Sequence, residues 1–268
     1  ESDESRASPK PRGYAAPALE KGIDILELLA REPDGLTVSE MAQRLGRSIS
    51  EIFRIIVVME RRRWLRKGPA TDRYTVTYRV LDVAFRATPA HTLTHVAAPV
   101  MHDLAIATNQ SCHLVVRGEA LGMVVQRQEN IGAVGFGMRL GATIDLVTSC
   151  SGHVLLAFMA AGRRYVIVAA LTEGDPAIRG QLVQRLEVVR VQGYEMQPSA
   201  RTAGVTDISY PVFGFDGHVA AALTIPFLVM IDGSQRITIQ ETRLLLRDAA
   251  ARISNGLGWT PDSAPLPA

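Results

Sequence analysis

The sequence predicts an α+β protein with two parts, a small winged helix-turn-helix followed by a larger domain of helices around an antiparallel sheet. Three observations predict this fold. Two helix-capping patterns flank a glycine near residue 46, basic residues concentrate between residues 44 and 79, and apolar strands alternate with helices after about residue 91. A chain of 268 residues is long enough to bury two cores of ordinary size.

The first helix is predicted from the run ALEKGIDILELLA at residues 18–30. Apolar residues recur in it at the spacing of a helix with one buried face. The residues expected on that face are Leu19, Ile23, Leu26 and Leu29. Pro33 and Gly35 follow closely and end the helix.

Two capping boxes mark the second and third helices. Thr37 precedes Glu40 by three residues, and Ser48 precedes Glu51 in the same way, with Gly46 between the helices. The third helix is expected to bury Ile52, Ile55, Ile56 and Met59. A hairpin around the tip at residues 68–72 completes a winged helix-turn-helix over residues 16–77, and residues 78–90 are predicted to be a linker helix.

The exposed face of the third helix is predicted to read DNA. A helix in the major groove needs an apolar back and a polar front that offers arginine to guanine edges. Serines at its start can reach phosphates, a carboxylate can accept from cytosine N4, and cations of the wing can meet the backbone. The residues predicted to contact DNA are Arg47, Ser48, Ser50, Glu51, Arg54, Arg61, Arg62, Arg66, Lys67 and Arg73. The alternative is a charged face that is merely solvated.

The charge distribution favours the DNA interpretation. Residues 44–79 carry ten arginines or lysines against three acidic residues, although the whole chain has a net charge of only +2. The rest of the chain is therefore acidic, and a basic segment within an acidic protein predicts a polyanionic partner for that segment, here double-stranded DNA.

The larger domain is predicted over residues 91–258. Its expected helices cover residues 94–109, a segment capped near Thr148 or Ser149, residues 176–192 and residues 234–258. Its expected strands are residues 110–118, 120–128, 207–215 and 219–227, the last two joined at an Asp-Gly turn. The polar segments 1–15 and 259–268 are predicted to be disordered tails.

Several other functions are not predicted. The GFGMRLG run lacks the dinucleotide-binding spacing, and TSCSGH lacks the glycines of a nucleophile elbow, so neither a cofactor nor an enzyme is expected. The spacing of His91, His95 and His102 could bind zinc on one helix face, but no further ligand completes the set. No apolar run of about 18 residues is present, which predicts no membrane span and a cytoplasmic protein.

A small-molecule pocket is the remaining candidate site. Cys150 and Ser151 lie at a predicted helix N-terminus, where free N–H groups favour a carboxylate. Gln197 and Asp207 come from the loop and strand that follow the 176–192 helix. The alternative for all four residues is a helix cap and ordinary turn positions.

Over residues 16–258 the chain resembles the IclR family of transcriptional regulators. The matching runs are ALEKGIDILELLA, GLTVSEMAQRLG, SISEIFRIIVVMERRRWL, TSCSGHVLLAF and VQGYEMQPSARTAGVTDISYPVFGFDGHVAAALTIP. The resemblance implies a GAF-like effector-binding domain and a homodimer, or dimer of dimers, on palindromic operators near catabolic genes. The effector-binding residues that it implies are Met123, Met138, Leu140, Cys150, Ser151, Leu155, Gln197 and Asp207.

The function expected from this resemblance is a ligand-responsive repressor of a catabolic operon. The implied effector is a small metabolite, an aromatic or small carboxylic acid. A carboxylate at Asp207 would repel an anion unless it is protonated or paired, which leaves room for an amide or hydrazide. The alternatives are an enzyme tethered by its N-terminal module and a protein-interaction module without an effector.

Overall fold

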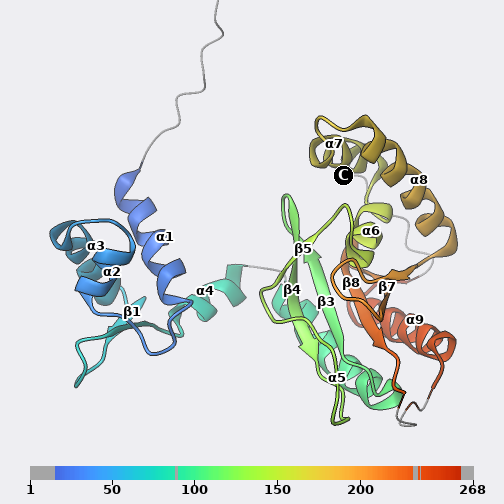
Figure 1. The fold of residues 1–268 in the computed structure, drawn as a ribbon, viewed down its shortest axis with the longest axis horizontal. Coiled ribbons are helices and arrows are strands. Elements are labelled where there is room, and N and C mark those ends of the chain that lie inside the picture. The colour runs from blue at the N-terminus through green and yellow to red at the C-terminus, as the bar shows by residue number, and fades with distance from the viewer. Residues whose placement is uncertain (1–15, 88–89, 232–234, 236, 261–268) are drawn as a thin grey trace, which may run out of the picture. The chain divides into compact units, whose positions relative to one another are not determined.

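The computed structural model describes residues 16–87, 90–231, 235 and 237–260. The predicted tail at residues 1–15 and most of the one at 259–268 lie outside these ranges. The chain divides into two compact units, Glu1–Thr88 and Pro89–Ala268, each with its own core. Figure 1 shows their elements.

The N-terminal unit is a winged helix-turn-helix. In chain order its elements are α1 (Pro17–Leu29), α2 (Val38–Arg44), α3 (Ile49–Arg61), β1 (Leu65–Lys67), β2 (Tyr74–Val76) and α4 (Arg79–Ala87). The strands β1 and β2 pair antiparallel and form the wing. An isolated bridge between Leu36 and Tyr74 joins the wing to the segment before α2.

Both predicted capping boxes are present. The Thr37 hydroxyl accepts from the Glu40 N–H at 3.3 Å, and the Glu40 carboxylate accepts from the Thr37 N–H at 2.8 Å. Ser48 and Glu51 make the same reciprocal pair at the start of α3. Gly46, between the two helices, has a φ of +60°, which a residue with a side chain rarely adopts. These local bonds orient α3 against α2.

The core of the N-terminal unit confirms the prediction for α3 and corrects the one for α1. Ile52 and Ile56 are fully buried. In α1 the prediction holds for Leu29, which is buried, and for Leu26, which packs against the core. It is wrong for Leu19 and Ile23, which are 64% and 47% exposed. Ile25, which was not predicted to be buried, is fully buried. The core residues contributed by α1 are Ile25 and Leu29.

The C-terminal unit has eleven elements within the described residues. They are α5 (Ala90–Thr108), β3 (Cys112–Arg117), β4 (Leu121–Gln128), β5 (Thr143–Asp145), α6 (Cys150–Ala157), α7 (Ala161–Leu171), α8 (Pro176–Gln192), β6 (Glu195–Pro198), β7 (Val205–Phe213), β8 (Val219–Leu228) and α9 (Ile239–Gly256). The predicted helices and hairpins are present. The sequence interpretation missed β5, β6 and α7, because strands of three or four residues show no periodicity and α7 has no side-chain cap.

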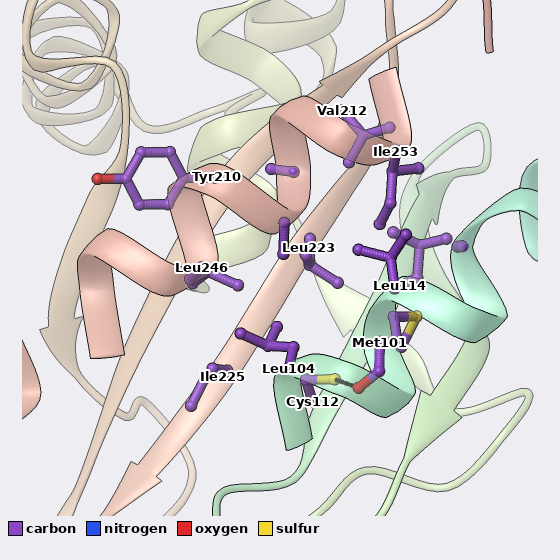
Figure 2. Packing of buried hydrophobic residues seen from close by; sticks show 14 of the residues in the cluster. Met101, Leu104, Cys112, Leu114, Tyr210, Val212, Leu223, Ile225, Leu246 and Ile253 are labelled. Carbon is purple, nitrogen blue, oxygen red and sulfur yellow. Dashed lines mark hydrogen bonds between the residues drawn. The ribbon is translucent and has the colours of Figure 1, made fainter. Parts of the chain in front are cut away.

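The sheet of this unit is antiparallel with strand order β5-β4-β3-β8-β7-β6. The helices α5 and α9 cover one face, and α6 packs on the other face with α7 and α8 outside it (Figure 1). The face under α5 and α9 carries an apolar core that includes Leu114, Leu223 and Ile225 (Figure 2). The opposite face, under α6, carries a second apolar core that includes Val115, Val124 and Ala222.

Cys112 and Trp259 are two further residues of the C-terminal unit with defined contacts. Cys112 is buried on β3; its thiol donates to the Met101 carbonyl at 3.7 Å, and burial raises its pKa to about 12. The prediction that the disordered tail begins at residue 259 is wrong for Trp259. Its ring stacks on Phe213 with centroids 5.0 Å apart, because an indole gains from apolar contact.

Candidate DNA-binding surface and effector pocket

The exposed arginines of α3 and of the wing are free of internal partners. Their guanidinium groups make no hydrogen bond or ion pair with any residue that the structure describes. These residues are Arg54, Arg61, Arg62, Arg63 and Arg66. Uncompensated cations on an exposed helix and the adjacent strand are what a phosphate backbone requires.

Three other predicted DNA contacts have acidic partners. Arg47 lies 3.6 Å from Asp24, and Lys67 lies 2.6 Å from Asp72. Both pairs are exposed, so they are weak and can open for a phosphate. The third residue, Arg73, is similarly exposed but makes three hydrogen bonds inside the unit.

Arg73 holds the wing against α2. Its guanidinium donates to both Glu40 oxygens, at 2.9 and 3.1 Å, and to the Gly35 carbonyl at 2.8 Å. Glu40 is also the capping residue of α2, and these bonds lower the pKa of its carboxyl, with the Thr37 backbone N–H as the largest cause. The structure therefore gives Arg73 a positioning role that the sequence did not reveal.

Glu51 is likewise engaged inside the unit. One of its oxygens accepts from the Lys21 ammonium at 2.9 Å, and the other accepts from the Ser48 N–H at 3.1 Å. The hydrogen bond from Lys21 is the main cause that lowers the pKa of Glu51 to about 2. The Glu51 carboxylate therefore caps α3 and links it to α1. Neither role requires a contact with cytosine.

An exposed apolar row on α3 escaped the prediction. Ile49, Phe53 and Val57 lie four residues apart and are 54%, 49% and 44% exposed. Side chains at this spacing share one helix face. The signal was present in the sequence as a second apolar stripe beside the buried one, and apolar groups on a reading helix can contact thymine methyl groups.

The C-terminal unit encloses a pocket of about 160 Å³ beside the N-terminus of α6. Four of the predicted effector-binding residues line it: Met138, Cys150, Ser151 and Asp207. The other lining residues come from β3 and β8, from the loop after β6, and from the chain that runs from the loop before β5 through β5 to the start of α6. Residues from four separate segments thus meet at one site.

The other four predicted residues do not line this pocket. Met123 and Leu140 are 47% and 60% exposed. Leu155 is buried in the core beneath α6, more than one turn from the helix start. Gln197 lies in β6 rather than in a loop, and its side-chain amide donates to the Thr148 carbonyl at 3.0 Å.

The start of α6 is fixed by Ser149 and Gly152. Ser149 caps the helix, since its hydroxyl accepts from the Gly152 N–H at 3.0 Å. A Cβ at Gly152 would lie 2.5 Å from the Leu146 Cα, which no real contact allows. Glycine is therefore required for α6 to reach the backbone before it, and this approach places Cys150 and Ser151 at the pocket.

Cys150 and Asp207 have shifted acidity in the pocket. Burial raises the pKa of the Cys150 thiol well above its usual value, and the nearby Glu195 and Asp207 carboxylates add to this effect. The thiol lies 3.3 Å from the Glu195 carbonyl and 3.4 Å from the Asp207 carbonyl. Burial also raises the pKa of Asp207, although a hydrogen bond from Ser199 partly opposes it. A neutral buried thiol is a donor and a packing group, not a nucleophile.

The buried carboxylate of Glu195, on β6, connects the sheet to α6 through His153. Glu195 is fully buried and accepts two hydrogen bonds from Arg185, one of them at 2.8 Å. His153 Nδ1 lies 3.0 Å from the same carboxylate, and Nε2 lies 2.7 Å from the Val147 carbonyl. His153 is therefore a buried, packed residue of α6. Burial acts to raise the pKa of Glu195, but the bonds from His153 and Arg185 outweigh it and the pKa is lowered.

His113 was missed by the sequence interpretation. It lies on β3 inside the apolar run CHLVV, is 4% exposed and lines the pocket. Burial lowers the pKa of its imidazole to about 4. The available sequence signal was a histidine inside an apolar run that predicts a strand.

This burial predicts a pH dependence of stability. A histidine with a lowered folded pKa is fully stabilising only above its unfolded pKa of 6.5, and that stability is lost as the pH falls toward 4. The difference of about 2.5 pH units corresponds to about 3 kcal/mol. We expect urea denaturation to show this loss between pH 6.5 and 4, and a smaller loss for His113→Phe. An equal pH dependence in both proteins would contradict the assignment.

The three histidines whose spacing could bind zinc, His91, His95 and His102, belong to α5. Within the described residues, no group of three histidine, cysteine, aspartate or glutamate side chains could hold a metal ion. The side chain of His91, one of the three histidines considered, lies outside the described set. In the described portion of the chain, no helix is both long and apolar enough to cross a membrane.

A winged helix-turn-helix with free arginines, followed by a domain that encloses a small pocket, defines a DNA-binding transcriptional regulator with a C-terminal effector-binding domain. Family comparison agrees for both parts. The profile "Bacterial transcriptional regulator IclR C-terminal" matches residues 85–255, and "IclR helix-turn-helix domain" matches residues 18–69. The chain belongs to the IclR family of bacterial transcriptional regulators.

The chain is similar to curated regulators and solved structures over most of its length. The DNA-binding transcriptional repressor YiaJ of Escherichia coli is 25% identical over 95% of this chain and 92% of its own length. The HTH-type transcriptional regulator BhcR of Paracoccus denitrificans is 29% identical over 92% and 89%. A solved IclR homolog from Microbacterium hydrocarbonoxydans, complexed with 4-hydroxybenzoate, has a TM-score of 0.74 at 23% identity and covers 90% of this chain and 98% of that one. The two curated relatives are named as a transcriptional repressor and a transcriptional regulator.

Proposed function

We propose that the protein is a ligand-responsive repressor of a catabolic operon. The free arginines on α3 and on the wing carry this proposal for the DNA-binding half, since no acidic residue in the described ranges neutralises them. Relatives named as repressors, YiaJ of Escherichia coli and AllR of Salmonella typhimurium, support the sign of regulation. The proposed domain boundaries are those expected from the sequence, with residues 78–90 as the linker.

The proposed DNA contacts differ in kind. Arg54, Ser48 and Ser50 read base edges or position α3, and the arginines at the end of α3 and on β1 bind phosphates. Arg47 and Lys67 bind phosphates after their exposed ion pairs open. A homodimer or dimer of dimers would place two such helices on a palindromic operator.

The proposed effector is a small metabolite in the 160 Å³ pocket. The homolog from Microbacterium hydrocarbonoxydans is complexed with 4-hydroxybenzoate, which is consistent with an aromatic or small carboxylic acid or its amide or hydrazide. Four of the residues proposed to bind it, Met138, Cys150, Ser151 and Asp207, line the pocket. Binding would shift the population toward an arrangement with a different affinity for the operator.

Replacing Arg54 with alanine tests the DNA-binding half. We expect the preference for the selected operator over random DNA to fall by about tenfold or more, since a good arginine–guanine contact is worth about 1–3 kcal/mol. Operators are first selected from random duplexes with the wild-type protein, and affinities are then measured at one salt concentration. Arg252→Ala is the matched control, because Arg252 forms an exposed pair with Asp103 in the C-terminal unit. An unchanged preference in Arg54→Ala would show that α3 does not read bases through this residue.

A further inference from the structure

A row of buried polar side chains crosses the sheet beneath α6. Directly paired residues of antiparallel strands point to the same face. His113 of β3 pairs with Thr224 of β8, Thr224 pairs with Ser209 of β7, and Ser209 pairs with Glu195 of β6. All four side chains are buried, with at most 4% exposure. The row is therefore a continuous polar strip inside an otherwise apolar layer.

Three members of the row have their hydrogen bonds satisfied inside the domain. Glu195 is bound by Arg185 and His153, and the hydroxyls of Ser209 and Thr224 lie 2.9 Å apart. His113 is the exception: its buried Nδ1 has no hydrogen-bond partner among the described residues. Buried polar atoms in native proteins almost always have a partner, and an atom without one costs free energy.

The unsatisfied end of the row is the end at the pocket. His113 and Thr224 both line the cavity, whereas Glu195 and Ser209 do not. The partner that Nδ1 lacks can therefore come from the molecule that occupies the pocket. A volume of about 160 Å³ suits a ligand with a single ring, since a cavity of about 150 Å³ in another protein accepts benzene.

The charges around the cavity decide which ligand group fits. Asp207 and Asp145 both line it, and Arg201, the one arginine in the lining, donates to the Thr143 carbonyl at 2.9 Å. An anion placed against a buried imidazole would lose its water and would also lie near these two carboxylates. An uncharged group that can donate and accept hydrogen bonds avoids both the loss of ionic hydration and the repulsion by the two carboxylates.

We propose that His113 is the specificity-determining contact of the effector, and that Nδ1 binds an uncharged hydroxyl or carboxamide of a one-ring ligand rather than a carboxylate. This inference rests on the proposed function of the pocket. It also explains why a histidine interrupts an apolar strand: the imidazole completes the polar row only when a ligand is bound.

The test uses calorimetric titration of the full-length protein with three probes of matched shape, benzamide, phenol and benzoate. At pH 7.5 we expect benzamide or phenol to bind at least tenfold more tightly than benzoate. His113→Phe should reduce that binding at least tenfold, and His113→Asn, whose amide can replace Nδ1, should retain most of it. The unliganded His113→Phe protein should melt at the same or a higher temperature, because no buried nitrogen is left unpaired.

Two results would overturn the assignment. The first is benzoate binding as tightly as benzamide and phenol, or none of the three binding at millimolar concentration. The second is neutral-probe binding that is unchanged in folded His113→Phe. The proposed function is tested separately, because operator selection by the wild-type protein does not depend on His113. Preserved DNA specificity together with either result would reject this inference alone.

Discussion

Replacing Glu195 with alanine is expected to lower the free energy of unfolding of the C-terminal unit by about 3 kcal/mol. Removing one partner of a buried ion pair costs about 3–5 kcal/mol, because the other charge is left uncompensated. The lower end applies here, since the Arg185 side chain is 39% exposed and can turn toward water, whereas His153 cannot. Urea denaturation at pH 7 measures the change.

Glu187→Ala is the matched control for this experiment. Glu187 lies on α8 and pairs with Arg190 at 2.8 Å, but both side chains are about half exposed. Exposed pairs contribute about 0–1 kcal/mol, so the control should change stability little. Equal effects of the two substitutions would mean that burial of the Glu195 network adds nothing to stability.

Acid should remove the same contribution in the wild-type protein. The folded pKa of Glu195 lies below its ordinary value of 4.5, because the bonds from His153 and Arg185 outweigh the effect of burial. Its stabilisation is therefore present above pH 4.5 and is lost as the pH falls through the lowered pKa. His113 acts over the higher window between pH 6.5 and 4, so the two groups can be separated by their variants.

The parts of the fold that depend on neighbours in sequence were predictable. The pairs Thr37–Glu40 and Ser48–Glu51 are three residues apart, and the helix itself brings them into contact. The same logic was only partly right for α1. Its C-terminal half buries Leu29 as predicted, but Leu19 and Ile23 are exposed because the first turns of the helix extend beyond the core.

The candidate sites depend on contacts between distant residues, which the sequence does not display. His153 and Glu195 are 42 positions apart, and Arg73 and Glu40 are 33 apart. Cys150, Ser151 and Asp207 were placed together by family resemblance, and the structure brings them to one pocket. Leu155 was placed there too, but α6 carries it more than one turn away into the core.

Replacing Ile56 with alanine is expected to destabilise the N-terminal unit by about 2–5 kcal/mol. Ile56 is fully buried against the residues that α1 and α2 contribute to the core. A unit of fewer than 90 residues has a small margin of stability, commonly near 5 kcal/mol, so this change leaves a substantial fraction unfolded. Operator binding should weaken accordingly, although Ile56 has no exposed surface with which to touch DNA.

Two substitutions on the same helix separate this effect from a loss of DNA contacts. Ile56→Val removes one methylene and should cost only about 0.5–1.5 kcal/mol, with binding largely retained. Val57→Ala alters a side chain that is 44% exposed, so it should leave the melting temperature nearly unchanged. If Val57→Ala nevertheless weakens operator binding, the exposed row of Ile49, Phe53 and Val57 contacts the bases. If Ile56→Ala binds normally, the core of this unit does not hold α3 in its reading position.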